Sequence, residues 1–260
     1  MIKCGITGHT GNLGTTIIKD NKNIKFFKFK GDITNKNLVN KWVNLNDFEY
    51  VIHLAAIVPT KKVLKNYKLA KKVNFIGTKN IVDSIIKSKK KINWFFFAST
   101  SHVYSFSKNK IKEKSKIQPI SKYGKTKLFA ENYIINKFKK SNINFCIGRI
   151  FSVYDNRDND FIISNLKKKI LNRKSTIILS NLNHFRDFVT TKYIAKVIFF
   201  LMKKKLNGTI NIGSGKKTHI KKIAIKMGKK YKKKLRFIDN IKPTIMVSDI
   251  SYLNRLGFKQ

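Results

Sequence analysis

Three glycines recur at intervals of three residues near the start of the chain, within the segment from Thr7 to Gly14 that reads TGHTGNLG. The residues from Ile2 to Thr7 predict a strand, and those from Asn12 to Lys19 predict a helix. Glycines at such a turn permit a tight bend, close approach of the backbone to a pyrophosphate, and close packing of the helix on the sheet. The segment therefore predicts an α/β fold that binds a dinucleotide at its first strand-to-helix turn.

Strand-like and helix-like segments alternate along the first half of the chain, which is typical of βαβ units and a parallel sheet. The further strands predicted are Lys25 to Phe29, Tyr50 to Ala55, Trp94 to Ser99, Phe145 to Ile150 and Thr209 to Ile212. The further helices predicted are Lys36 to Val43, Ala70 to Lys87, Ile120 to Lys139 and Thr190 to Lys203. This order predicts a doubly wound α/β sheet with helices on both faces.

The chain is strongly basic. Its 260 residues are 42% hydrophobic and 12% aromatic, which suits one domain with a small lobe and excludes wholesale disorder. The 57 Lys and Arg against 13 Asp and Glu give a formal charge of +44, but only six of the 57 are arginine, the residue that reads bases through bidentate contacts. Because the lysines are spread over the whole chain, we expect a solvated basic surface and no specific nucleic-acid partner. A selected polyanionic partner is the alternative.

Cys4 and Cys146 both lie in apolar, strand-like segments, so we expect two buried free thiols and a reducing compartment. The N-terminus enters the first strand directly, without a charged region followed by an apolar stretch. No apolar run approaches the ~20 residues of a membrane span. The expected location is the cytoplasm, without membrane association.

Short motifs follow the glycine segment in a fixed order along the chain. They are GDI at 31–33, VIHLAA at 51–56, VNFIGT at 73–78, FASTSHVY at 97–104, YGKTK at 123–127, RDFV at 186–189 and NIGSG at 211–215. Together they resemble the extended short-chain dehydrogenases, the NAD-dependent epimerase/dehydratase family of nucleotide-sugar enzymes, over nearly the whole chain. The resemblance implies a Rossmann dinucleotide-binding domain of residues 1–150 and 187–212 and a small C-terminal substrate-binding lobe of residues 151–186 and 213–260. It also implies a homodimer formed through the helix that carries Tyr123.

By this resemblance, NAD or NADP binds at the glycine segment and at the ends of the following strands. The implied cofactor-binding residues are Gly8, Thr10, Gly11, Asn12, Leu13, Gly14, Asp32, Ile33, Leu54, Ala55, Ala56, Asn74, Tyr123 and Lys127. Asp32 either meets the adenine edge, as in the family, or, eighteen residues after Gly14, grips the ribose 2′-hydroxyl. Lys28 and Lys30 are placed to receive a 2′-phosphate, so the choice between NAD and NADP stays open.

Tyr123 and Lys127 are four residues apart on a predicted helix, so they share one face and lie about 6 Å apart along the axis. We expect the Lys127 ammonium to lower the pKa of the Tyr123 phenol, which makes the tyrosine an acid-base group near neutral pH. The resemblance adds Thr100 as the hydroxyl that hydrogen-bonds the substrate oxygen, with Ser99 and Ser101 as other occupants of that role. The implied reaction is hydride exchange between the nicotinamide and a sugar carbon, while Tyr123 moves the hydroxyl proton.

The resemblance implies four substrate-binding residues: Ser101, Ser152, Arg186 and Lys242. Ser152 stands where the family usually has an asparagine, and Lys242 stands where an arginine before proline often binds the diphosphate. Arg186 is the better phosphate ligand because its guanidinium group can form two parallel hydrogen bonds. Ser101 and His102 replace the acidic pair of the family's 4,6-dehydratases, which disfavours elimination of water.

We therefore expect a nucleotide-sugar epimerase or ketoreductase that serves surface-polysaccharide synthesis. The alternative is a non-catalytic dinucleotide-sensing or RNA-binding protein of the same fold, against which the intact Thr100, Tyr123 and Lys127 argue. His9, His184 and His219 have no spacing that suggests a metal site, so no metal is expected.

Overall fold

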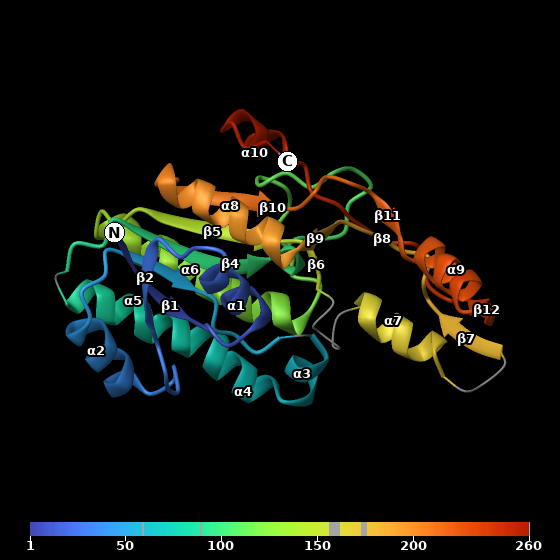
Figure 1. The fold of residues 1–260 in the computed structure, drawn as a ribbon, viewed down its shortest axis with the longest axis horizontal. Coiled ribbons are helices and arrows are strands. Elements are labelled where there is room, and N and C mark those ends of the chain that lie inside the picture. Colours follow the sequence, from blue (N-terminus) through green and yellow to red (C-terminus); the bar gives the residue numbers. More distant parts are fainter. Residues whose placement is uncertain (59, 89, 156–161, 173–175, 260) are drawn as a thin grey trace.

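A parallel sheet of six strands forms the centre of the computed structural model, which describes residues 1–58, 60–88, 90–155, 162–172 and 176–259 (Figure 1). The strands lie in the order β10-β5-β4-β3-β1-β2. Their bounds are β1 Ile2–Thr7, β2 Ile24–Lys28, β3 Tyr50–His53, β4 Trp94–Thr100, β5 Phe145–Ile150 and β10 Gly208–Ile212. The chain runs from β1 to β2 on one side and through β3, β4 and β5 on the other. The predicted doubly wound α/β sheet is thus confirmed.

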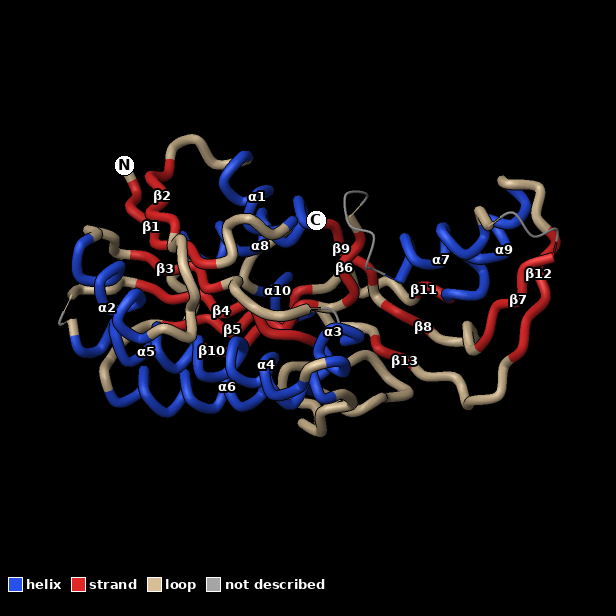
Figure 2. The backbone as a smooth tube through the Cα atoms, turned by 90° about the horizontal axis from the view of Figure 1, so that it is seen from below, coloured by secondary structure: helices blue, strands red, loops and turns tan. Residues whose placement is uncertain are grey.

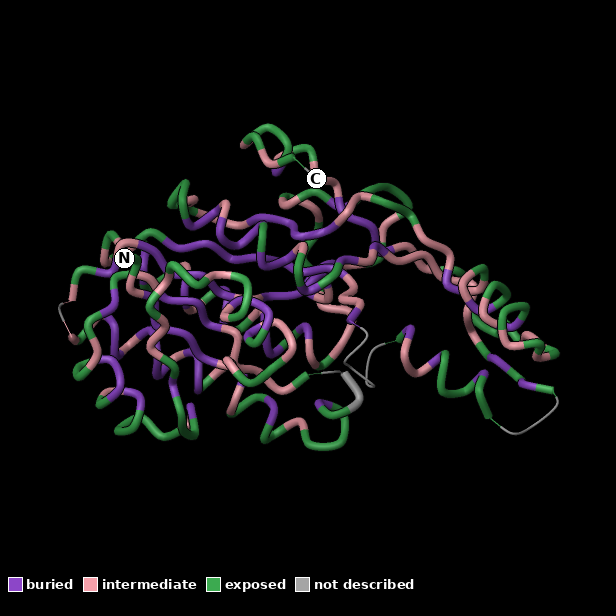
Figure 3. Tube along the Cα trace, in the orientation of Figure 1, coloured by how far each residue is buried: buried purple, intermediate pink, exposed green. Residues whose placement is uncertain are grey.

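Helices cover both faces of this sheet (Figure 2). On one face lie α1 Asn12–Lys19 and α8 Thr191–Lys203, and on the other lie α2 Lys36–Leu45, α5 Thr78–Lys87 and α6 Lys122–Lys140. Alternate residues of a strand serve the two faces: Phe96 belongs to the first core, and Phe95 and Phe97 belong to the second. Because both faces are covered, the strands at the centre of the sheet are apolar and buried (Figure 3).

The helix predicted from Ala70 to Lys87 is divided into three parts. These are α4 Tyr67–Lys71, the π-helical turn η1 Lys72–Gly77, and α5. Asn74 lies inside the π-helical turn, and its side chain bonds the backbone of Ile57. A short helix, α3 Thr60–Lys65, precedes them and has no counterpart in the prediction. The wider π-helical turn thus interrupts the 3.6-residue helical period at the point where the Asn74 side chain bonds the Ile57 backbone.

Among the further element ends that differ from the prediction, polar contacts explain two. β3 ends at His53 instead of Ala55, because the chain leaves the sheet there and the Ala55 amide donates to Thr7 Oγ1 (3.2 Å). α6 begins at Lys122 instead of Ile120, since Ser121 is its N-cap and accepts a hydrogen bond from the Gly124 amide (3.0 Å). Polar side chains thus set both ends.

A smaller group of elements lies at one end of the sheet and has a core of its own (Figure 1). It contains α7 Ile162–Ile170, α9 Ile220–Lys230 and the parallel strands β7 Thr176–Ser180 and β12 Lys234–Ile238, packed through Leu166, Ile170, Ile177, Leu179, Ile220 and Ala224. Short strands lead to it from the sheet: β6 Ser152–Tyr154, β8 Phe185–Arg186, β9 Phe188–Thr190, β11 Thr218–His219 and β13 Ile245–Met246. The last helix, α10 Ser251–Arg255, returns to the large core through Leu253. The residue boundaries between domain and lobe stay a prediction.

Asp187 joins the smaller part to the sheet. Its fully buried carboxylate accepts hydrogen bonds from the amides of Ser214 (2.8 Å) and Gly215 (3.0 Å). It also accepts from the Ser248 amide (3.1 Å) and from the hydroxyls of both serines. The Asp187 backbone carbonyl accepts from the Ser152 amide (2.9 Å). The hydrogen bonds of Asp187 therefore lie near each place where the chain passes between the sheet and the smaller part.

Cys4 and Cys146 are both buried and free, as predicted. Burial raises the pKa of each thiol, so both are inert parts of the core. None of the helices in the described part of the chain has both the length and the apolar character needed to cross a bilayer.

Candidate active site

The glycine segment forms the turn from β1 to α1. Gly8 has a φ of +69°, and a Cβ atom on it would lie 2.6 Å from the Ala55 amide nitrogen. A Cβ atom on Gly14 would lie 2.4 Å from the Gly8 carbonyl oxygen. At Gly11 the nearest atom would be 3.5 Å away, which is an ordinary contact. Gly8 and Gly14 therefore allow close packing of the turn, whereas Gly11 leaves the backbone accessible at the N-terminus of α1.

A cavity of about 500 Å³ lies where β1, β2 and β3 end. Its lining consists of Gly8, His9, Thr10, Phe29, Lys30, Gly31, Asp32, Ile33, Ala55 and Val73. No side chain caps α1 at Gly11, so the first amides of the helix can donate to a phosphate. The cavity and the neighbouring turn thus suit the adenosine and the pyrophosphate of a dinucleotide.

Acidic and basic side chains both reach this cavity. Asp32 Oδ1 accepts from the Thr34 amide (2.8 Å) and Oδ2 from the Thr34 hydroxyl (2.9 Å), and these bonds hold the pKa of Asp32 below its ordinary value. Lys30 is part of the lining, whereas Lys28 is an exposed residue of β2. Since the Asp32 carboxylate and the Lys30 ammonium group both belong to the cavity lining, the preference for NAD or NADP stays a prediction.

Asn74 is fully buried and holds two elements of the site together. Its Oδ1 atom accepts from the Ile57 amide (2.7 Å), and its Nδ2 atom donates to the Ile57 carbonyl (3.2 Å) and to the Thr126 hydroxyl (3.0 Å). The side chain thus positions the loop after β3 against α6. Direct contact with the cofactor stays a prediction for all of the implied residues, both those that line the cavity and those outside it, namely Gly11, Asn12, Leu13, Gly14, Leu54, Ala56, Asn74, Tyr123 and Lys127.

Thr100, Tyr123 and Lys127 come together from β4 and α6. The hydroxyl group of Thr100, the last residue of β4, lies close enough to the Tyr123 phenol group to lower its pKa. Lys127 is 1% exposed, and its ammonium nitrogen lies 3.9 Å from the centre of the Phe97 ring. Gly124 allows the close approach of α6, because a Cβ atom there would lie 2.2 Å from the backbone carbonyl oxygen of residue 102. The predicted catalytic residues are assembled at one place, and their roles stay predictions.

The pKa values of these groups differ from the prediction. Burial raises the pKa of Tyr123, and the nearby Thr100 hydroxyl opposes this shift. Burial lowers the pKa of Lys127 to about 7, and the charge of Glu131 opposes that shift. The prediction that Lys127 lowers the pKa of Tyr123 is therefore wrong, because removal of both groups from water is the larger effect.

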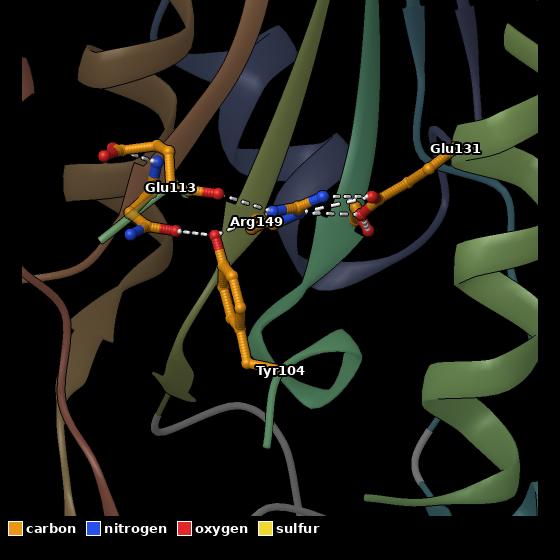
Figure 4. A network of polar contacts seen from close by, with 6 residues as sticks. Tyr104, Glu113, Glu131 and Arg149 are labelled. Carbon is orange, nitrogen blue, oxygen red and sulfur yellow. Dashed lines mark hydrogen bonds and ion pairs between the residues drawn. The ribbon is translucent and has the colours of Figure 1, made fainter. Parts of the chain in front are cut away.

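A buried polar network lies behind these residues (Figure 4). Arg149 Nη2 donates to Glu131 Oε2 (2.7 Å), and Arg149 Nη1 donates to the Tyr104 hydroxyl (2.9 Å). Glu131 also accepts a hydrogen bond from Ser99. The network connects α6 to β4 and β5. Because the Ser99 hydroxyl is used inside it, Thr100 is the better candidate for a hydroxyl that meets the substrate.

Arg186 lies close enough to His102 for its charge to lower the pKa of that histidine. Its guanidinium group donates to the Phe185 carbonyl (2.8 Å) and to the Thr244 carbonyl and hydroxyl (3.1 Å each). Burial lowers the pKa of Arg186 to about 10, so the group remains a cation at neutral pH. Hydrogen bonds thus hold the positive charge of Arg186 in place near the predicted catalytic residues.

The other predicted substrate residues are more scattered. Ser101 is buried at the start of the 3₁₀ turn η2 Ser101–Val103, and Ser152 is half-buried in β6. Lys242 is exposed in the loop between β12 and β13. Contact of these residues and Arg186 with a substrate stays a prediction.

His102 belongs to the site, although the sequence pattern does not identify it. Its Nδ1 atom lies 3.0 Å from Ser121 Oγ, and its ring meets the Tyr123 ring edge-on with centroids 6.0 Å apart. Burial, helped by the charge of Arg186, lowers the pKa of His102 to about 4. The sequence signal for His102 is its position two residues after Thr100. The prediction uses that position only to note that the acidic pair of the dehydratases is missing. Within the described ranges, no three His, Cys, Asp or Glu side chains stand together as a metal site would require.

Comparison with known proteins gives matches over most of the chain. The family model described as GDP-mannose 4,6 dehydratase matches residues 5–249. A Methanocaldococcus jannaschii protein assigned provisionally as UDP-glucose 4-epimerase is 32% identical, over 80% of this chain and 69% of its own length. GDP-6-deoxy-D-talose 4-dehydrogenase of Aggregatibacter actinomycetemcomitans is 28% identical, over 82% of this chain and 75% of its own length. The solved structure of MoeE5 with UDP-glucuronic acid and NAD superposes with a TM-score of 0.85 at 19% identity, covering 99% of this chain and 93% of MoeE5.

Proposed function

Since the chain belongs to the GDP-mannose 4,6 dehydratase family of extended short-chain dehydrogenases, we propose that it is an NAD(P)-dependent nucleotide-sugar epimerase or ketoreductase. The observation that carries the proposal is the meeting of Thr100, Tyr123 and Lys127 beside a turn and cavity that suit a dinucleotide. The relatives named as a 4-epimerase and a 4-dehydrogenase support the two alternatives. Surface-polysaccharide synthesis in the cytoplasm is the process we propose for it.

In this proposal each residue of the catalytic group has one task. The nicotinamide, when bound, supplies or accepts a hydride at a sugar carbon. Tyr123 takes up or returns the proton of the hydroxyl group on that carbon. Thr100, which lies beside the phenol, holds the sugar oxygen. Lys127, whose pKa of about 7 lets it change its charge near neutral pH, holds the cofactor beside Tyr123.

Elimination of water is not part of the proposal. The two residues after Thr100 are Ser101 and His102, and neither supplies a carboxylic acid. The pKa of His102, about 4, leaves its ring uncharged at neutral pH and unsuited to protonate a leaving hydroxyl. The family model is described as a dehydratase, but that description therefore does not determine which reaction this chain catalyses.

The deciding experiment is an assay of the purified protein against a panel of nucleotide sugars, with NAD and NADPH added separately. An epimerase would carry tightly bound nicotinamide and need no added cofactor, whereas a ketoreductase would need added NADPH. Cofactor binding without turnover of any nucleotide sugar would contradict the proposal. It would favour the non-catalytic dinucleotide-sensing or RNA-binding alternative.

Replacing Lys28 and Lys30 together by alanine is expected to weaken NADPH binding several-fold more than NADH binding. Lys30 lines the cavity, and an exposed contact between ammonium and phosphate contributes about 1 kcal/mol or less. The difference should shrink as salt rises. Dissociation constants from fluorescence titration measure it, and Lys22→Ala is the control for lost surface charge. Equal losses for both cofactors would mean that these lysines are only solvated surface.

We also propose a homodimer formed through α6. The outer surface of α6 and its neighbours exposes apolar side chains: Phe129 is 42% exposed, and Leu69 and Ile76 lie in the adjacent α4 and η1. Phe129→Glu is expected to convert a dimer into a monomer, because dimer formation would then bury the unpaired carboxylate of the new glutamate between the two subunits. Light scattering after gel filtration measures this, with Ile225→Glu, at a 40% exposed position of α9, as the control. A parent that is monomeric would refute the dimer.

A further inference from the structure

The contact of His102 with Ser121 bears on where its ring proton lies. Its Nδ1 atom is 3.0 Å from Ser121 Oγ. Ser121 Oγ already accepts the Gly124 amide hydrogen (3.0 Å) as the N-cap of α6, so its own hydrogen is available to Nδ1. We assign this hydrogen to the contact, which makes Nδ1 the acceptor and places the proton of the neutral imidazole on Nε2.

The Nε2 atom of His102 is an accessible donor. It hydrogen-bonds no side chain or backbone group of the described residues, in which Trp42 Nε1 is the only buried side-chain nitrogen or oxygen without a partner. Nε2 is therefore reachable by solvent. Its ring lies edge-on to Tyr123, and the His102 amide donates to Thr100 Oγ1 (3.2 Å). A free donor thus stands beside the two groups that handle the reacting oxygen.

We propose that His102 binds the sugar by donating a hydrogen bond from Nε2 to an oxygen next to the reacting carbon. This inference rests on the proposed function, because it adds one contact to the same site. It implies a nucleotide sugar that carries a hydroxyl group or another oxygen beside the carbon that exchanges hydride. His102 is then a substrate-binding residue that selects among sugars, in addition to Thr100.

The ring acts as a neutral donor and not as an acid. The ionisable groups that face it are Tyr123 and Arg186, and neither is an anion at neutral pH that would favour the imidazolium form. Burial acts in the same direction. Proton transfer accordingly stays with Tyr123, while His102 contributes binding and orientation.

Two amide variants separate the two ring nitrogens. In His102→Gln the amide nitrogen can take the position of Nε2, whereas in His102→Asn the shorter side chain reaches only the position of Nδ1. For the best nucleotide sugar of the panel, we expect His102→Asn to lower kcat/KM by about tenfold to a hundredfold, the effect of one lost hydrogen bond in a site. His102→Gln should stay within about threefold of the parent and keep the parent's pH profile, because no proton is exchanged.

The dissociation constant for NAD and the thermal unfolding midpoint should be unchanged in both variants, which shows that fold and cofactor site are intact. An Asn variant as active as the parent would overturn the inference, and so would a Gln variant as impaired as the Asn variant. Loss of an ionisation from the pH profile of His102→Gln would assign proton transfer to His102 instead. A parent without activity on any nucleotide sugar would refute the proposed function itself.

Discussion

Replacing Tyr123 by phenylalanine is expected to reduce turnover by at least about a hundredfold and to leave cofactor binding nearly unchanged. The substitution removes the phenolic oxygen beside Thr100, while the ring that packs against His102 remains. The pKa of the neighbouring His102, about 4, makes it a weak base, so it is not expected to take over the proton transfer. The measurements are kcat on the best nucleotide sugar and the dissociation constant for NAD.

Tyr133→Phe is the matched control for this variant. Tyr133 lies on the same helix, but its hydroxyl group bonds Asp83 of α5 and not the catalytic residues. The control should keep full turnover. A Tyr123→Phe enzyme that retains turnover within about tenfold of the parent would remove Tyr123 from the role of acid-base group.

Replacing Arg149 by methionine is expected to lower the free energy of unfolding by about 3–5 kcal/mol. Arg149 and Glu131 are both buried, and three hydrogen bonds of 2.7–3.2 Å join guanidinium to carboxylate. Methionine has a similar length but leaves the Glu131 carboxylate in the core without its cation. An unpaired buried charge is far less favourable than the pair or than an apolar contact.

A second variant tests this reasoning. Arg149→Met combined with Glu131→Leu removes both charges, so it should recover most of the lost stability. Urea unfolding of the parent, the single variant and the double variant gives the free energies. A single variant that loses less than about 1 kcal/mol would show that the carboxylate finds another partner or a proton.

Features that depend on neighbouring residues along the chain could be predicted from the sequence. The spacing of the glycines defines the turn after β1, and the spacing of Tyr123 and Lys127 defines a helix face. Alternating apolar segments give the order of strands and helices, and β1, β5 and α1 have the predicted bounds. These signals are local in the sequence, so a single amino-acid sequence is enough to interpret them.

Features that depend on tertiary contacts could not be predicted in this way. The raised pKa of Tyr123 follows from burial, which the spacing to Lys127 does not report. The π-helical turn around Asn74 is used to meet Ile57, a residue on another segment. His102 gains its place only when η2 packs on α6, an approach that Gly124 permits. In each case the deciding partner is distant in sequence.

The bonds around Asp187 have a consequence for how such enzymes diversify. Its carboxylate and carbonyl contact the chain near all four crossings between the sheet and the smaller part, at Ser152, Ser214 and Ser248 and at Asp187 itself. The elements α7, β7, α9 and β12 have a core of their own, so they can change while the junction keeps its shape. A graft of the smaller part from a relative would need both of its segments together, matched at this one junction. Under the proposed function, in which the smaller part binds the nucleotide sugar, such a graft is expected to change the substrate range and to leave the residues of β4 and α6 as they are.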